Sequence, residues 1–319
     1  MRLVDSHCHL ESERFSADID AVLGRARTVG VERILVPGWN AWSSQAAVEL
    51  VERFTWLDAA VGVHPHDAAK VDEVGWAGIT RLAADPRVVA VGETGLDYDR
   101  VFSPVEDQLA NLRRNLALAL DTAKPLILHC RSRAGARDGQ DALLAELRAA
   151  GVGGQVWVAA FGDRPPAVIH SFSGPVDYAG SMLDLNVAIS FSGLVFRRGE
   201  EISADVAAAV PPDRLLVETD APFLSPPGAP RGRNEPEWVR VTAAWLATQR
   251  GERQDVVGER LVVAYDRVFQ RLQRGRQDPD RPALAKPHAG DGLAEPQAGD
   301  GLAEPQAGDG LAAGSSDRA

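Results

Sequence analysis

Residues 3–10 read Leu3-Val4-Asp5-Ser6-His7-Cys8-His9-Leu10, a short apolar run that ends in two histidines separated by one residue. Side chains alternate between the two faces of a β-strand, so His7 and His9 point to the same side. Two nitrogen donors at the end of a strand suggest half of a metal site. Taken alone, the pair is better explained by two surface histidines near the N-terminus.

The rest of the chain repeats this arrangement of a buried strand followed by a longer amphipathic stretch. Eight apolar runs have the character of strands, at residues 3–5, 33–37, 57–63, 88–92, 125–128, 167–169, 187–191 and 215–218. Helices are expected near 16–29, 42–54, 72–84, 104–123, 138–150, 175–184, 202–209, 235–250 and 254–273. Eight such units over roughly 270 residues predict an α/β fold, a closed (β/α)8 TIM barrel. The turn after the first strand is His-Cys-His and not Gly-rich, which disfavours an open dinucleotide-binding sheet.

Two segments fall outside the repeated units. Residues 151–166 place glycines and prolines around an apolar run, and we expect either an extra strand or a lid over the barrel mouth. The nonapeptide Ala-Gly-Asp-Gly-Leu-Ala-Glu-Pro-Gln occurs at 289–297 and again at 298–306. One leucine per repeat offers too little apolar surface to offset the cost of ordering the chain. The sequence therefore predicts a barrel domain over 1–273 and a disordered tail over 274–319.

Composition limits the partners and the compartment of the protein. The 319 residues carry a formal net charge of −11, so any contact with nucleic acid must be local or assisted by bound cations. No apolar run approaches the length of a membrane span, and the first strand begins without a secretory segment. We expect a cytoplasmic protein without membrane association or an obligate protein partner. Its two cysteines indicate neither a disulfide framework nor a cysteine-based zinc motif.

Six potential metal ligands share the same position at the end of an apolar run: His7, His9, Glu93, His129, His170 and Asp220. In a parallel barrel the C-terminal ends of all the strands meet at one rim, so these side chains are expected to converge. Four imidazoles and two carboxylates suffice for two metal ions that share a bridging ligand. Two ions roughly 3.5–4 Å apart activate a water molecule and clamp the oxygens of a phosphate or carbonyl group.

At this point the chain resembles the TatD family of metal-dependent hydrolases, within the amidohydrolase-like barrel superfamily. The resemblance covers about residues 1–272 and rests on Asp5-Ser6-His7-Cys8-His9, Gly62-Val63-His64-Pro65-His66, Gly92-Glu93-Thr94-Gly95-Leu96-Asp97-Tyr98, Leu128-His129-Cys130-Arg131, His170-Ser171-Phe172-Ser173-Gly174, Glu218-Thr219-Asp220-Ala221-Pro222 and Arg233-Asn234-Glu235-Pro236. It implies that one divalent ion is bound by His7, His9, Glu93 and Asp220, and a second by Glu93, His129 and His170. Asp220 would also accept a proton from the attacking water. Without the histidines, Glu93 would be interpreted as a helix-start carboxylate and Asp220 as an N-cap.

Several further residues are candidates for substrate contacts. His64 and His66 either contact a substrate phosphate or only cap their loop, and Arg131 offers a fork of donors to a phosphate oxygen. Asp97 is a candidate to orient a metal-bound imidazole. The remaining polar and aromatic candidates, for which helix capping or packing is the simpler role, are Asn234, Glu235, Trp39 and Trp42.

The resemblance favours a deoxyribonuclease that cleaves phosphodiester bonds of DNA, at single strands or ends, with a water activated by two divalent cations. An alternative with the same metal centre is a hydrolase of small carbonyl or phosphate esters, lactones or amides. A third hypothesis is a non-catalytic barrel that binds metal or a protein partner. Magnesium, manganese and zinc all remain open as the metal, because imidazole ligands favour the softer ions and phosphate chemistry favours magnesium.

Overall fold

Eight parallel strands form the centre of the protein, in a computed structural model that describes residues 1–269. They are β1 (Leu3–Asp5), β2 (Val31–Pro37), β3 (Leu57–Val61), β4 (Val88–Asp97), β5 (Leu126–Arg131), β6 (Ala167–Ile169), β7 (Ala188–Phe191) and β8 (Leu215–Val217). Their order in the sheet is their order in the chain. Backbone hydrogen bonds from Ser6 N–H to Val217 O and from Asp220 N–H to His7 O join the last strand to the first. The predicted (β/α)8 barrel is confirmed.

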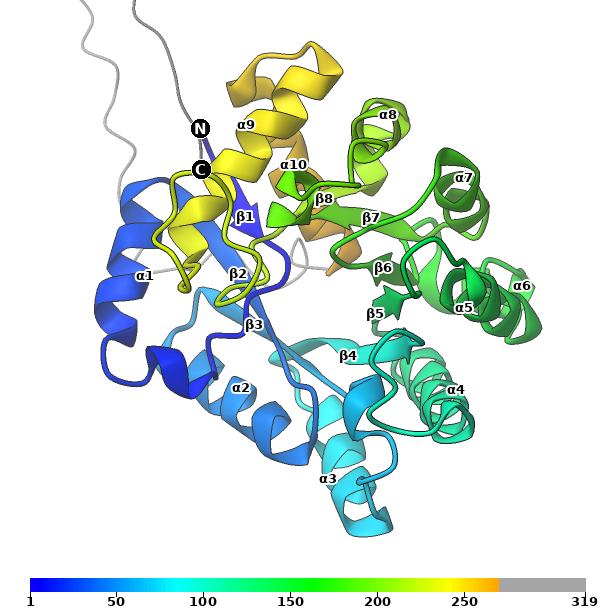
Figure 1. The fold of residues 1–319 in the computed structure, drawn as a ribbon. Helices are drawn as coiled ribbons and strands as arrows, with labels where there is room; N and C mark the ends of the chain where they lie inside the picture. The colour runs from blue at the N-terminus through cyan, green and yellow to red at the C-terminus, as the bar shows by residue number, and fades with distance from the viewer. Residues whose placement is uncertain (270–319) are drawn as a thin grey trace, which may run out of the picture. The chain divides into compact units, whose positions relative to one another are not determined.

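Helices surround these strands, as Figure 1 shows. They are α1 (Ile19–Thr28), α2 (Ala41–Arg53), α3 (Glu73–Ala83), α4 (Val105–Thr122), α5 (Asp138–Ala149), α6 (Gln155–Phe161), α7 (Val176–Asp184), α8 (Ser203–Ala209), α9 (Val239–Arg250) and α10 (Gln254–Val268). Each of the longer helices turns one apolar stripe toward the strands; in α1 the buried positions Ile19, Val22, Leu23 and Ala26 have the spacing of a single helix face. Strands covered in this way are buried on both sides, as all five residues of β3 are.

Two strands extend further than their apolar runs predict. β4 continues to Asp97 and β5 to Arg131, so that Glu93 and His129 lie inside strands and not beyond their ends. The ladder shifts register between Val91 and Thr94 and then resumes, with Thr94 opposite Leu128. Polar side chains that face the barrel mouth interrupt the apolar pattern without interrupting the backbone pairing. The predicted C-terminal ends of β4 and β5 therefore come too early in the sequence.

The segment 151–166 is neither a strand nor a lid, so both expectations for it are wrong. It contains the helix α6, in which Trp157 and Phe161 are buried with their rings stacked 5.6 Å apart. The indole of Trp157 donates to Ala150 O at 2.9 Å, and Pro166 O accepts from Leu126 N–H at the start of β5. The segment therefore lies at the N-terminal end of the strands, opposite the mouth that the histidines occupy. Two aromatic residues four positions apart are the helical signal in it.

The predicted disordered tail at 274–319 and the last residues of the helix expected to end at 273 lie outside the described residues. Within residues 1–269 no helix combines the length and the apolar character needed to cross a bilayer.

Candidate metal centre

Six side chains from five segments meet at the C-terminal end of the strands. Their positions are His7 and His9 directly after β1, Glu93 within β4, His129 within β5, His170 directly after β6, and Asp220 after β8. The exposed fractions of the six side chains run from 0% for His7 to 18% for His129. The convergence follows from the parallel topology, because every strand runs toward the same rim.

The first ligand group joins the β1 histidines to one oxygen of Glu93. His7 Nε2 and His9 Nε2 lie 3.2 Å apart, and Glu93 Oε2 lies 3.3 Å and 3.6 Å from them. Asp220 Oδ1 completes the group at 3.7 Å and 3.5 Å from the same two nitrogens. Ligands bound tetrahedrally at 2.0–2.1 Å are about 3.4 Å apart, so these separations are those of a metal-sized cage.

The second group gathers at the other oxygen of Glu93. His170 Nε2 lies 2.9 Å and His129 Nδ1 3.1 Å from Glu93 Oε1, and the two nitrogens are 3.2 Å apart. His64 Nε2 also approaches this oxygen, at 3.3 Å. The two oxygens of a single carboxylate thus belong to two different histidine groups, as a bridging ligand requires.

Carboxylates behind three of the histidines determine which ring nitrogen carries the proton. The pairs are His9 Nδ1 with Glu11 Oε1 at 3.0 Å, His129 Nε2 with Asp97 Oδ2 at 3.4 Å, and His170 Nδ1 with Glu218 Oε1 at 3.2 Å. Glu11 and Glu218 accept the outer N–H of His9 and His170 in hydrogen bonds, whereas Asp97 lies close enough to His129 Nε2 to favour the proton there without forming a hydrogen bond. In each ring this leaves the inner nitrogen with its lone pair. When the rings are neutral, as metal binding requires, the inner nitrogens face one another and Glu93, so acceptors oppose acceptors. This donor set fits divalent cations.

His64 belongs to the cluster in a different way. Its Nδ1 accepts from His66 N–H at 3.1 Å, so the proton of a neutral ring is on Nε2, where it points at Glu93 Oε1. Burial lowers the pKa of His64 to about 4, which keeps the ring neutral at pH 7. His64 therefore both caps its loop and donates into the cluster. His66 Nε2 instead lies 2.7 Å from Asp97 Oδ2.

Despite burial, the pKa values of Glu93 and Asp220 are lowered by the neighbouring histidines, and carboxylates in turn raise the pKa of His170. Burial would raise the pKa of Glu93, but its interactions with the surrounding imidazoles, that of His170 first, hold the pKa well below its usual value. Burial opposes ionisation of Asp220 too, and its hydrogen bond to His9 still lowers its pKa. Conversely, Glu93 and Glu218 raise the pKa of His170 well above its ordinary value despite burial. Protons on His9 and His170 thus supply positive charge that metal binding would replace.

Buried polar contacts hold the loop that carries Asp220. The carboxylate of Asp5, at the end of β1, accepts from Thr219 N–H at 2.9 Å and from Thr219 Oγ1 at 2.6 Å. Asn234 is fully buried and donates to Thr219 O at 2.9 Å and to Phe223 O at 2.7 Å. Asn234 is thus a support for this loop, and the helix-cap interpretation of it is wrong.

A glycine two residues after Glu93 permits close packing of β4 on β5. Gly95 has a φ of 139°, and a Cβ at this position would lie 1.9 Å from His129 O. Only glycine combines this backbone conformation with such an approach. Because β4 and β5 pack closely, Glu93 Oε1 lies 3.1 Å from His129 Nδ1.

The other candidates lie around the mouth. Arg131 is exposed and its Nε donates to Asp99 Oδ2 at 2.8 Å, which leaves its terminal NH2 groups outside that contact. Trp39 packs edge-on against His9 with ring centroids 5.2 Å apart, whereas Trp42 is 60% exposed.

The sequence analysis missed the roles of Glu11 and Glu218. Glu11 continues the alternation of His7 and His9 by two residues, and Glu218 ends the β8 run two residues before Asp220. A buried carboxylate at the edge of an apolar run was the available signal, because such a group needs a partner.

Comparison with known proteins relates the whole barrel to one family. The family model described as TatD related DNase matches residues 4–270. The 3'-5' ssDNA/RNA exonuclease TatD of Klebsiella pneumoniae (strain 342) is 38% identical over 256 residues, covering 78% of this chain and 91% of that protein. The uncharacterized metal-dependent hydrolase YabD of Bacillus subtilis (strain 168) is 36% identical over 245 residues, covering 77% and 90%. The solved structure of YJJV, a TatD homologue from Escherichia coli K12, has a TM-score of 0.74 at 31% identity, over 84% of this chain and 98% of that one.

Proposed function

The chain belongs to the TatD-related DNase family, and we propose that it removes nucleotides from the ends of single-stranded DNA or RNA. Membership makes it a metal-dependent hydrolase that acts on phosphodiester bonds. The proposal for single strands is supported by relatives of 35–38% identity named 3'-5' ssDNA/RNA exonuclease. The alternative substrates, small carbonyl esters, lactones and amides, have no comparable support.

We also propose that two divalent cations, of magnesium, manganese or zinc, act in the reaction. The first would be held by His7, His9, Glu93 and Asp220, and the second by Glu93, His129 and His170. This proposal rests on the positions of the two carboxylate oxygens of Glu93. Oε2 lies 3.3 Å from His7 Nε2, and Oε1 lies 2.9 Å from His170 Nε2. Divalent cations in such a site stabilise negative charge on phosphate oxygens and lower the pKa of a water molecule.

The chain's own side chains supply the proton transfer and the positioning. Asp220 is the more exposed of the two candidate catalytic carboxylates, at 14% against 3% for Glu93. Its lowered pKa keeps it ionised and able to accept the proton of the attacking water. Arg131 lies at the same mouth, and its terminal NH2 groups are proposed to donate hydrogen bonds to the substrate phosphate. His64 and His66, the other two predicted substrate contacts, direct their Nε2 atoms at Glu93 and Asp97 instead.

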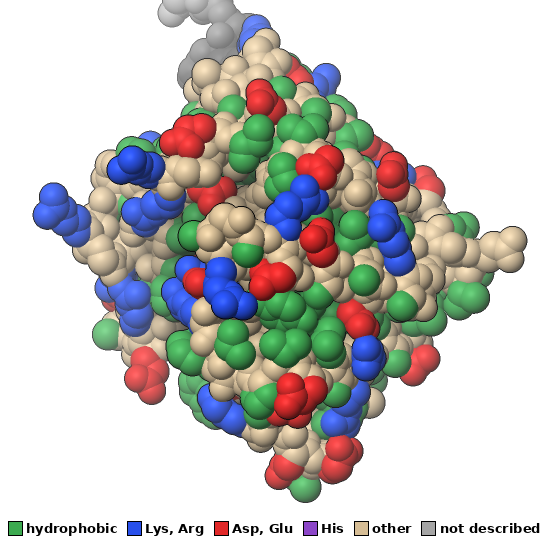
Figure 2. Space-filling view, turned by 45° about the vertical axis from the view of Figure 1, so that its right-hand side comes forward, with side chains coloured by type: hydrophobic (Ala, Val, Ile, Leu, Met, Phe, Trp, Pro, Cys, Tyr) green, Lys and Arg blue, Asp and Glu red, His purple; other side chains and the backbone are tan. Residues whose placement is uncertain are grey.

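The charge distribution is consistent with local binding of a strand end and not with a broad grip on duplex. Basic and acidic side chains are interspersed over the face shown in Figure 2, in a chain whose net charge is −11. Long-range attraction of a polyanion needs a surface of one sign. Bound dications would reverse the local field at the mouth, where only a few nucleotides need to be held.

The test combines metal analysis of the purified protein with digestion of short single-stranded DNA, with and without a chelator. We expect Glu93→Ala and Asp220→Ala each to abolish hydrolysis while circular dichroism shows a folded barrel. Asp121→Ala removes an exposed carboxylate at the end of α4 and serves as the matched control. Full activity in either ligand variant would reject the mechanism. Turnover of carbonyl esters without digestion of DNA would favour the alternative substrates.

A further inference from the structure

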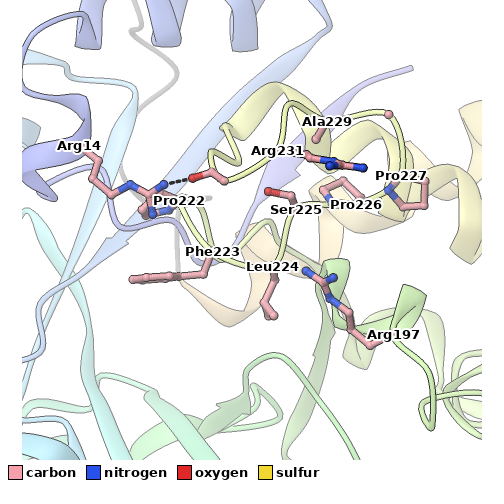
Figure 3. A pocket seen from close by; sticks show the side chains of 12 residues that line it. Arg14, Arg197, Pro222, Phe223, Leu224, Ser225, Pro226, Pro227, Ala229 and Arg231 are labelled. Carbon is pink, nitrogen blue, oxygen red and sulfur yellow. Dashed lines mark hydrogen bonds between the residues drawn. The ribbon is translucent and has the colours of Figure 1, made fainter.

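Beside the metal centre lies a cavity of about 480 Å³ that the proposed chemistry does not use. Its wall is formed mainly by the segment after β8, with contributions from the segments that follow β1 and β7. Figure 3 shows Arg14 on one side of Leu224 and Ser225, and Arg197 and Arg231 on the other. The remaining wall is largely proline and glycine.

The cavity has a charge opposite to that of the protein as a whole. Among the described residues 1–269, three arginines and no carboxylate line it, although acidic residues outnumber basic ones by 45 to 34 in the chain. Arg197 and Arg231 are exposed and form no ion pair within residues 1–269. Arg14 donates to Gly232 O, which leaves its other donors free. Unpaired guanidinium groups gathered in a concave site are suited to phosphate groups.

An aromatic side chain connects the cavity to the metal centre. Phe223 lines the cavity, is 52% exposed, and lies with its ring centroid 6.0 Å from that of His9. It follows Asp220 by three residues, and its N–H donates to Asp220 O at 2.8 Å. An exposed ring beside a catalytic centre is a platform on which any of the nucleobases can stack, because each has a flat aromatic face.

The segments that carry these side chains are held together by the backbone. Gly193, in the 3-10 turn Gly193–Phe196 after β7, packs so closely on the β8 segment that a Cβ would lie 1.9 Å from Leu224 O. Arg197 directly follows this turn. Asn234 holds the other side of the same segment through Phe223 O. The backbone that carries the platform and the arginines is therefore in place before any ligand binds, which reduces the entropic cost of binding.

We propose that this cavity is the strand groove of the enzyme, the site that holds single-stranded nucleic acid next to the nucleotide being removed. Phe223 stacks on a base beside the scissile bond, and Arg14, Arg197 and Arg231 bind the phosphates that follow. The proposal rests on the nuclease function proposed above and extends it to the path of the strand. It accounts for binding of a polyanion by an acidic protein, because the positive charge is concentrated where the strand lies.

The first test measures binding of a fluorescein-labelled phosphorothioate decathymidylate, which resists hydrolysis, to the metal-loaded full chain at several salt concentrations. Each phosphate contact to a single strand contributes about 0.7 to the slope of log affinity against log salt. We expect the double variant Arg197→Gln/Arg231→Gln to bind at least tenfold more weakly, with a slope smaller by about 1.4. Lysines at both positions should restore the slope.

Matched control variants distinguish the effect of charge in the cavity on binding from the effect of the protein's net charge. Arg81→Gln/Arg148→Gln makes the same change of charge on exposed arginines of α3 and α5 and should leave affinity and slope unchanged. Phe223→Ala should weaken binding about tenfold at an unchanged slope, because stacking carries no counterion release.

The outcomes distinguish the groove from the nuclease proposal. If the wild-type protein digests DNA and the Arg197→Gln/Arg231→Gln variant binds like the controls, the strand groove is wrong and the nuclease proposal stands. If binding depends on the two arginines but the wild-type protein digests no nucleic acid, the groove stands and the nuclease proposal fails. Absence of any binding by the wild-type protein overturns the groove.

Discussion

Replacing Glu93 by glutamine tests the two-cation arrangement most directly. Glutamine preserves the shape of the side chain but replaces one of its oxygens by an NH2 group and removes the charge. Oε2 of Glu93 faces His7 and His9, and Oε1 faces His129 and His170. The substitution therefore weakens both ligand groups at once. By contrast, Asp220→Asn disturbs the His7–His9 group.

The expected size of the effect follows from binding linkage. A cation present at about 100 times its dissociation constant stabilises the folded state by about 2.7 kcal/mol, and two such cations by about 5.4 kcal/mol. At about 2 °C per kcal/mol for a barrel of this size, wild-type protein should gain roughly 10 °C in Tm when metal is added. Asp220→Asn should gain about half as much, and Glu93→Gln almost nothing.

Thermal unfolding with and without manganese or zinc, together with the metal content after desalting, measures these gains. Asp121→Asn, on the exposed surface of α4, is the control and should match the wild type. Equal losses in Glu93→Gln and Asp220→Asn, or a full metal content in Glu93→Gln, would refute the bridging role.

Three further substitutions test the supports of the site and the barrel. Glu218→Gln removes the carboxylate behind His170 and should lower metal affinity about 10- to 100-fold without unfolding, as measured by competition with a chromophoric chelator. Gly193→Ala places a Cβ against Leu224 O and should cost about 1–3 kcal/mol in urea unfolding, with weaker binding of oligonucleotide. The hydrogen bond from Arg87 lowers the pKa of Asp85 to about 2, below its value of about 3.9 in the unfolded chain. The ionised pair therefore stabilises the fold above about pH 4, and this stabilisation is lost as the pH falls through 2. Asp85→Asn should therefore cost about 1 kcal/mol at pH 7, after allowance for solvent screening, and about half as much at pH 3, where equal costs would contradict the assignment.

Local hydrophobic patterns in the sequence were sufficient to predict the barrel architecture. The barrel was predictable because a buried parallel strand needs a continuous apolar run and a surface helix needs an apolar stripe, and both are properties of neighbouring residues. The helix α6 escaped this method because glycines and prolines surround a run of only seven residues. The extensions of β4 and β5 escaped it because their polar side chains face the mouth.

The sequence by itself determined the barrel and named the six side chains that meet at its rim, since parallel topology alone sends every strand end to one place. Only the tertiary structure decided how they are arranged: that the two oxygens of Glu93 face different histidines, that Glu11 and Glu218 back His9 and His170, and that three arginines from separate segments line one cavity with Phe223. These relations join residues up to about two hundred positions apart, and a ring nitrogen or a guanidinium acquires its role from the atoms beside it in space.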